Sequence, residues 1–206
     1  MVVAGVAAAA MIATAPGASA ATATVKPAAA KADAAKAKAA KAQAKAKSSG
    51  KPAAQQNLTF YDSITPSEIP ANQQIATYAD GKFAVDRSLV SNPDQVIWID
   101  INGHDANANA LDVEPGDARP SEVANWVQRR LTAHPGSIAI VYTMRSEWAA
   151  AKASVATLPA AMRSEVRWWI ADPTGHPHIV PGSQATQWYW GENYDVSSAL
   201  PDFEQP

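Results

Sequence analysis

Short apolar runs alternate with clusters of turn residues through most of the chain beyond residue 57. Runs of four to eight residues that are rich in β-branched and aromatic side chains are typical of strands. Runs of this kind occupy residues 58–61, 75–78, 96–101, 110–113, 138–143, 166–171 and 185–190, and a shorter run of three occupies residues 194–196. The pattern therefore predicts a sheet built from eight short strands.

Between the fourth and fifth runs lies a segment whose apolar residues recur at helical spacing. Pro120 occupies a first-turn position that favours proline, and His134-Pro135-Gly136 marks the end. Between them, apolar residues recur at positions 123, 126, 127 and 131. A second helix is predicted over residues 146–158. Strands that alternate with helices pair in parallel, so this part of the sheet is predicted to be parallel and the fold class α/β.

Two links are too short to hold a crossover helix. Residues 102–109 join the third strand to the fourth, and Gly191-Glu192-Asn193 joins the last two strands. The first link is therefore expected to be a tight loop, and the second cannot hold the crossover of about a dozen residues or more that a parallel pair uses. The end of the sheet is therefore expected to be irregular, with final strands that lack intervening helices.

The first 56 residues differ from the rest in composition. Residues 1–20 combine an apolar run with Ala18-Ser19-Ala20, the small-x-small form that signal peptidase cleaves, and predict a secretory signal peptide. The alternative is an Ala-rich disordered N-terminus. Residues 21–56 consist largely of Ala and Lys without an apolar stripe, so they predict a disordered linker. The folded domain is assigned to residues 57–206.

Charge separates these regions as well. Residues 21–56 hold eight Lys and one acid, whereas the remainder holds nine Lys or Arg against eighteen Asp or Glu, a formal charge of −9. Phosphates require cationic partners, so nucleic acid is not an expected partner of this domain. The chain has no Cys, which excludes disulfides and thiolate metal sites. An integral membrane segment is not expected in the mature chain, because the apolar run is short and Ala-rich.

The tetrapeptide Leu111-Asp112-Val113-Glu114 contains the clearest candidate chemistry. Residues two apart in a strand point to the same face, so both carboxylates would lie together. Neighbouring acids repel each other, which raises the pKa of one of them. Glycoside hydrolysis uses such a pair, with one protonated donor and one ionised stabiliser. The alternative is a strand end with solvated acids.

The order of several short motifs resembles the family-25 glycoside hydrolases, the cell-wall lysozymes or N-acetylmuramidases. The motifs are Leu-Asp-Val-Glu (111–114), Ile-Val-Tyr-Thr (140–143), Trp-Trp-Ile-Ala (168–171), Thr-Gln-Trp (186–188) and Tyr-Asp-Val (194–196). The opening Phe-Tyr-Asp-Ser (60–63) is also similar to related exported glycoside-hydrolase-like domains of unknown function. The resemblance covers residues 61–199 and implies a compact, irregular TIM-like β/α barrel.

The resemblance also implies roles for particular residues. Glu114 would be the general acid and Asp112 the stabiliser of the oxocarbenium-like or oxazolinium species, with Asp62 and Asp195 completing the catalytic acids. Positions that bind substrate or line the cleft would be Asp100, Tyr142, Trp169, Gln187 and Trp188. No metal or other cofactor is expected.

The resemblance is incomplete. The folded part is shorter than the about 200 residues or more that an ordinary eight-stranded barrel needs, and Tyr61-Asp62-Ser63 replaces the usual start of the family. Asp100 fits either the acid ring or a loop cap, and Trp188 fits either a ligand site or the core. His176 and His178 fit a plain loop better than a metal site.

These observations predict a secreted, cell-wall-associated monomer that hydrolyses a glycosidic bond in a wall polysaccharide such as peptidoglycan. The alternative is a catalytically inactive domain that binds wall glycan on the same fold. Convergence of Asp62, Asp112, Glu114 and Asp195 at one mouth of the barrel would favour the enzyme.

Overall fold

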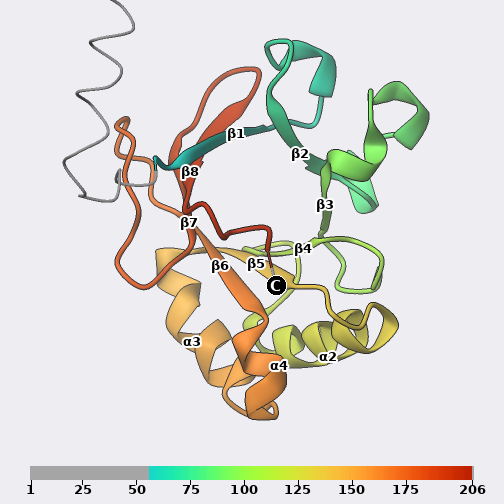
Figure 1. Cartoon of the computed structure of the whole chain (residues 1–206), viewed down its shortest axis with the longest axis vertical. Coiled ribbons are helices and arrows are strands. Elements are labelled where there is room, and N and C mark those ends of the chain that lie inside the picture. The colour runs from blue at the N-terminus through green and yellow to red at the C-terminus, as the bar shows by residue number, and fades with distance from the viewer. Residues whose placement is uncertain (1–55, 206) are drawn as a thin grey trace, which may run out of the picture. The chain divides into compact units, whose positions relative to one another are not determined.

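The structure is a computed structural model that describes residues 56–205 (Figure 1). The signal peptide and nearly all of the linker predicted for residues 1–56 lie outside the described residues. Within the described part, all eight predicted strands are present and form one closed barrel. This confirms the α/β class and a barrel architecture.

The strands follow one another around the barrel in chain order, from β1 to β8. Their bounds are β1 Leu58–Asp62, β2 Gln74–Tyr78, β3 Ile97–Asp100, β4 Ala110–Val113, β5 Ala139–Met144, β6 Val166–Ala171, β7 Ala185–Tyr189 and β8 Asp195–Ala199. The predicted last strand ended at Val196, but β8 continues for three more residues. The two serines that extend it are buried, a burial that their polarity conceals in the sequence.

The direction of β8 distinguishes it from the other strands. Neighbouring strands from β1 to β7 pair in parallel, whereas β8 pairs antiparallel with both β7 and β1. The link from β7 to β8 is too short for a crossover, so the chain can only reverse there. The barrel is therefore mixed, and its closing strand is the irregular one.

Helices cover one side of the barrel, outside β4, β5 and β6 (Figure 1). They are α2 Val123–Ala133, α3 Arg145–Val155 and α4 Ala160–Ser164. The first two confirm the predicted helices, and α4 was not anticipated. Pro120 begins a 3-10 turn, Pro120–Glu122, that leads into α2, and Glu122 accepts a hydrogen bond from the Arg119 backbone at its start.

Alternating residues of β4 and β5 serve two separate cores. In β4, Leu111 and Val113 pack outward with Trp126 and Val127 of α2. Ala110 faces the barrel interior, where it packs with residues such as Phe60 and Trp169. Because side chains alternate along a strand, Asp112 shares the interior face with Ala110. The hydrophobic pattern of β4 thus directs one carboxylate into the barrel.

Within residues 56–205, no helix is both long and apolar enough to cross a membrane.

Candidate functional site

Four carboxylates converge at the end of the barrel where β1 and β4 finish and β8 begins. Asp62 is the last residue of β1, Asp112 lies one residue before the end of β4, and Glu114 follows that strand. Asp195 is the first residue of β8, and the antiparallel pairing sets it directly opposite Asp62. We call these four residues, Asp62, Asp112, Glu114 and Asp195, the acid mouth.

Gln187 of β7 connects several members of this site. Its amide nitrogen donates to both oxygens of Asp62, at 3.0 and 3.1 Å, and to Asp195 at 3.3 Å. Its amide oxygen accepts from the Tyr142 hydroxyl at 2.8 Å and from the Trp190 indole. Gln187 is 2% exposed. One buried amide therefore fixes the positions of two acids and two aromatic residues.

Asp112 lacks such support. Its side chain is buried, and its Oδ1 atom has no hydrogen-bond partner among the described residues. Carboxylate oxygens of Asp112, Glu114 and Asp117 all lie within 4.8 Å of one another. At the rim, Lys82 Nζ lies 3.8 Å from Asp117 Oδ1. The three acids form an oxygen-rich group that could hold a metal ion.

Burial raises the pKa of every acid of the mouth, and neighbouring charges add to the shift for Asp62, Asp112 and Glu114. Burial, followed by the charge of Asp195, raises the pKa of Asp62 to about 7, although the Gln187 hydrogen bond opposes this. Burial and then the charges of Glu114, Asp117 and Asp62 raise the pKa of Asp112 well above its ordinary value.

The two remaining acids shift in the same direction. Burial raises the pKa of Glu114; the Tyr142 hydroxyl opposes the shift, and the charges of Asp117 and Asp195 add to it. Burial also raises the pKa of Asp195, while the hydrogen bond from the Gly191 backbone opposes it. The pKa values of all four acids of the mouth are therefore shifted upward, the direction that favours the protonated carboxyl group.

Two predicted aromatic positions lie beside or beneath the acids. Tyr142 reaches the mouth through Gln187, and its ring contacts Trp169 edge-on at 4.6 Å. Trp169 is 1% exposed, and its indole donates to the Ser197 hydroxyl at 2.9 Å. Trp169 thus lies in the core under the mouth and presents no open face for a sugar ring.

Within residues 56–205, no side-chain hydrogen bond joins Asp100 or Trp188 to the acids of the mouth. The carboxylate of Asp100 accepts hydrogen bonds from three backbone amides of the following loop, residues 102, 103 and 105, and from the Trp126 indole at 2.9 Å. It therefore caps this loop on the helix-covered side. Trp188 is partly buried and lies between Gln187 and Tyr189, where the register of β7 with β8 is irregular and strand alternation is interrupted.

Several residues of the site were not anticipated from the sequence. Tyr78 ends β2 with a half-buried side chain, and burial followed by the charge of Asp62 raises its pKa. Its position two residues after Ala76 in an alternating strand was a usable signal. Asp117 joins the mouth because the chain turns back at Pro115-Gly116, so that its amide donates to the Glu114 carbonyl at 3.0 Å. That turn was visible in the sequence, but its direction was not.

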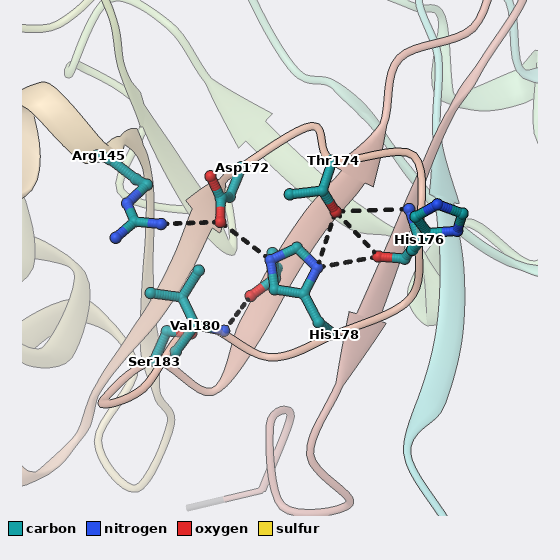
Figure 2. Close-up of polar contacts among 8 residues, drawn as sticks. Arg145, Asp172, Thr174, His176, His178, Val180 and Ser183 are labelled. Atoms are coloured by element: carbon teal, nitrogen blue, oxygen red, sulfur yellow. Dashed lines mark hydrogen bonds and ion pairs between the residues drawn. The ribbon is translucent and has the colours of Figure 1, made fainter.

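A second polar cluster follows β6 in the loop before β7. Figure 2 shows Asp172 between Arg145 and His178, to which it is joined at 2.9 and 3.0 Å. Burial works to raise the pKa of Asp172, but these two partners lower it overall. The hydrogen bond with the His176 carbonyl, followed by the pairing with Asp172, raises the pKa of His178. The cluster links this loop to Arg145 at the start of α3.

A groove of about 690 Å³ lies elsewhere, lined by residues of the segments 66–75 and 89–96. Its side chains are uncharged, being mainly Pro, Ser, Asn, Gln and aliphatic residues. The groove is large, but no acidic or basic side chain among the described residues lines it. The candidate site is therefore the acid mouth, where titratable groups converge.

Comparison of the chain with protein-family models, with curated proteins and with solved structures finds no match in any of the three. Functional assignment therefore depends on the geometry and chemistry of the acid mouth.

Proposed function

We propose that this chain hydrolyses a glycosidic bond in a cell-wall polysaccharide, with peptidoglycan as the substrate. The observation that supports this most is the convergence of Asp62, Asp112, Glu114 and Asp195 at one end of the barrel. Like charges confined in a partly buried site destabilise a fold, and such departures from stability are expected at functional sites. Acid-assisted cleavage of a glycosidic bond needs this kind of arrangement.

In the proposed reaction, Glu114 donates its proton to the oxygen of the glycosidic bond. The bond from the anomeric carbon to that oxygen breaks, and its electron pair stays with the departing sugar. The Asp112 carboxylate stabilises the positive charge that develops on the anomeric carbon. A water molecule then adds to this carbon and returns a proton to Glu114, which restores the site.

The separation of the two carboxyl groups indicates the stereochemical course. Oxygens of Asp112 and Glu114 lie within 4.8 Å of each other. Inverting glycosidases keep their carboxyl groups about 6.5–9.5 Å apart to admit a water, whereas retaining ones need only about 5–5.5 Å. The observed spacing supports retention of configuration.

Exposed aromatic residues at the end of β7 and just after it offer a surface for sugar rings. Tyr189 and Trp190 are 43% and 49% exposed, and the Trp190 indole is anchored to Gln187. Aromatic faces pack against the apolar side of a hexose, where few hydroxyl groups require hydrogen bonds. We propose that these two residues, rather than the buried Trp169, contact the glycan.

The proposal also covers the family to which the barrel belongs and the place where the protein acts. We propose that the barrel is a shortened, irregular TIM-like member of the family-25 lysozyme type. We further propose that the protein is exported, acts as a monomer and associates with the cell wall, as the composition of residues 1–56 suggests.

Hydrolysis of purified peptidoglycan tests the proposal. The wild-type protein should release soluble sugars with new reducing ends, and Glu114→Gln should lose about 10²–10⁴-fold of the turnover while remaining folded. Glu165→Gln is the matched control, because this glutamate precedes β6 at the opposite end of the barrel, and it should retain the wild-type rate.

Two outcomes would redirect the assignment. Full activity in Glu114→Gln would place the acid elsewhere. Retention of the protein on insoluble peptidoglycan without any release of reducing ends would identify the domain as the inactive glycan-binding alternative.

A further inference from the structure

The group formed by Asp112, Glu114 and Asp117 has a feature that glycan hydrolysis does not require. Hydrolysis uses two of these acids, yet a third is brought to the same point by the turn after β4. Asp117 is partly buried and lies across the turn from Glu114. Three carboxylate oxygens within 4.8 Å of one another concentrate negative charge in a small volume.

Asp112 provides a second and independent observation. Its side chain is 3% exposed, and its Oδ1 atom is buried without a partner among residues 56–205. The other largely buried acids of the barrel wall differ, since Asp62 receives the Gln187 amide on both oxygens and Asp100 is held by backbone amides and an indole. A buried carboxylate without a donor is unfavourable unless another group compensates for its lost hydration.

The protein itself supplies little positive charge at this point. Lys82 reaches Asp117 at 3.8 Å, and its own side chain is 61% exposed. An ion pair of this length with a mostly exposed lysine contributes little. The buried end of the three-acid group therefore lacks a positive charge to balance its carboxylates.

We propose that Asp112, Glu114 and Asp117 bind a divalent cation of the size of Ca²⁺. Hard cations select carboxylate oxygens, and Ca²⁺ holds them at about 2.3–2.6 Å, so that two ligands on opposite sides of the ion lie about 4.6–5.2 Å apart. For Mg²⁺ that limit is about 4.0–4.2 Å. The observed span of up to 4.8 Å accommodates Ca²⁺ without rearrangement.

The site is expected to be weak and selective for the larger ion. Three protein ligands leave several positions to water, and calcium sites of low ligand count in extracellular modules have dissociation constants of about 10⁻⁴–10⁻³ M. Mg²⁺ demands near-ideal octahedral geometry and gives up its water reluctantly, so its affinity should be lower than that of Ca²⁺.

Cation binding would also regulate the proposed hydrolysis, and this consequence rests on the proposed function. Glu114 cannot donate a proton while its carboxylate coordinates a cation. Added Ca²⁺ should therefore inhibit turnover with a midpoint equal to the dissociation constant measured without glycan.

Titration calorimetry of the full chain with CaCl₂ tests the site directly. The wild-type protein should bind one ion at about 10⁻⁴–10⁻³ M, and both Asp117→Asn and Glu114→Gln should weaken binding at least about tenfold. Asp94→Asn is the matched control, because Asp94 is exposed in the 3-10 turn before β3, and it should bind as the wild type does. Circular dichroism establishes that each variant is folded.

The proposal is overturned if the wild type shows no saturable binding up to about 10 mM Ca²⁺. It is also overturned if folded Asp117→Asn and Glu114→Gln bind as tightly as the wild type. The calorimetry contains no glycan, so it can succeed where the hydrolysis assay fails. Hydrolysis that is insensitive to Ca²⁺, with no binding heat, would leave the proposed function standing and remove only the cation site.

Discussion

The interior of the barrel has two layers that are built from the same strands and behave in opposite ways. Residues two apart share a face, so β1 contributes Phe60 to one layer and Asp62 to the other. We call the layer around Phe60, Trp169 and Phe203 the apolar layer. The acid mouth occupies the other layer, at the ends of the parallel strands.

The apolar layer is closely packed. Phe60 contacts Trp169 edge-on at 4.9 Å and stacks on Phe203 at 5.5 Å, and each of the three is no more than 2% exposed. The one polar atom of Trp169 has a partner in Ser197. This layer stabilises the barrel through burial of large side chains and leaves no polar group unpaired.

The acid mouth differs from the apolar layer in both its packing and its hydrogen bonding. It places several carboxyl groups together under partial burial, and it leaves an oxygen of Asp112 without a donor. The apolar layer therefore stabilises the fold, whereas the acid mouth destabilises it. Mutations in the two layers should therefore act in opposite directions on the free energy of unfolding.

The largest effect is expected from Trp169→Ala in the apolar layer. Loss of this buried indole should destabilise the domain by about 3–5 kcal/mol, because a large cavity replaces its packing. Trp190→Ala makes the same chemical change at a half-exposed position and should lower stability by no more than about 1 kcal/mol. Denaturant unfolding measures both, and equal losses would contradict the division into layers.

A pH-dependent effect is expected from Asp62 in the acid mouth. Its pKa in the folded state is raised to about 7 from 3.8, so the folded domain holds a proton that the unfolded chain releases. The stability from this proton is complete below pH 3.8, declines as the pH rises towards 7 and is absent above it.

Asp62→Asn should therefore match the wild type near pH 4 and exceed it at pH 8. Because Asn offers Gln187 one acceptor oxygen where Asp62 offers two, the gain should be on the order of 2 kcal/mol. Unfolding at a series of pH values, with exposed Asp94→Asn as the control, measures this difference. A variant that is less stable than the wild type at pH 8 would show that the hydrogen bonds of Asp62 outweigh its burial.

The smallest changes are expected from Asp112→Asn and Asp195→Asn. Each removes a repelling charge, so each variant should be as stable as the parent or up to about 1 kcal/mol more stable near neutral pH without divalent cations. Asp100→Asn is the contrasting control, because Asp100 accepts bonds on both oxygens and should lose about 2 kcal/mol. Losses above about 2 kcal/mol in both mouth variants would mean that these acids hold the fold together.

The sequence alone predicted the elements of the fold well. The strand over 110–113 and the helix around Trp126 and Val127 follow from periodicity, because burying one face imposes a repeat on the apolar residues. The irregular end of the barrel followed from the length of the link after Trp190, since three residues cannot hold a crossover. The pairing of Asp112 with Glu114 was likewise visible, because it is local along the chain.

Only the tertiary structure decided which distant residues meet. The register between β1 and β8 sets Asp62 opposite Asp195, and no local pattern specifies that register. The same holds for Gln187, whose hydrogen bonds to Asp62 span 125 positions, and for Trp169, whose buried place under the mouth cannot be distinguished from an exposed one by residue type. Local physics determined the strands, helices and the acid pair, whereas closure of the barrel determined the acid mouth, because closure alone brings residues far apart in sequence within hydrogen-bonding distance.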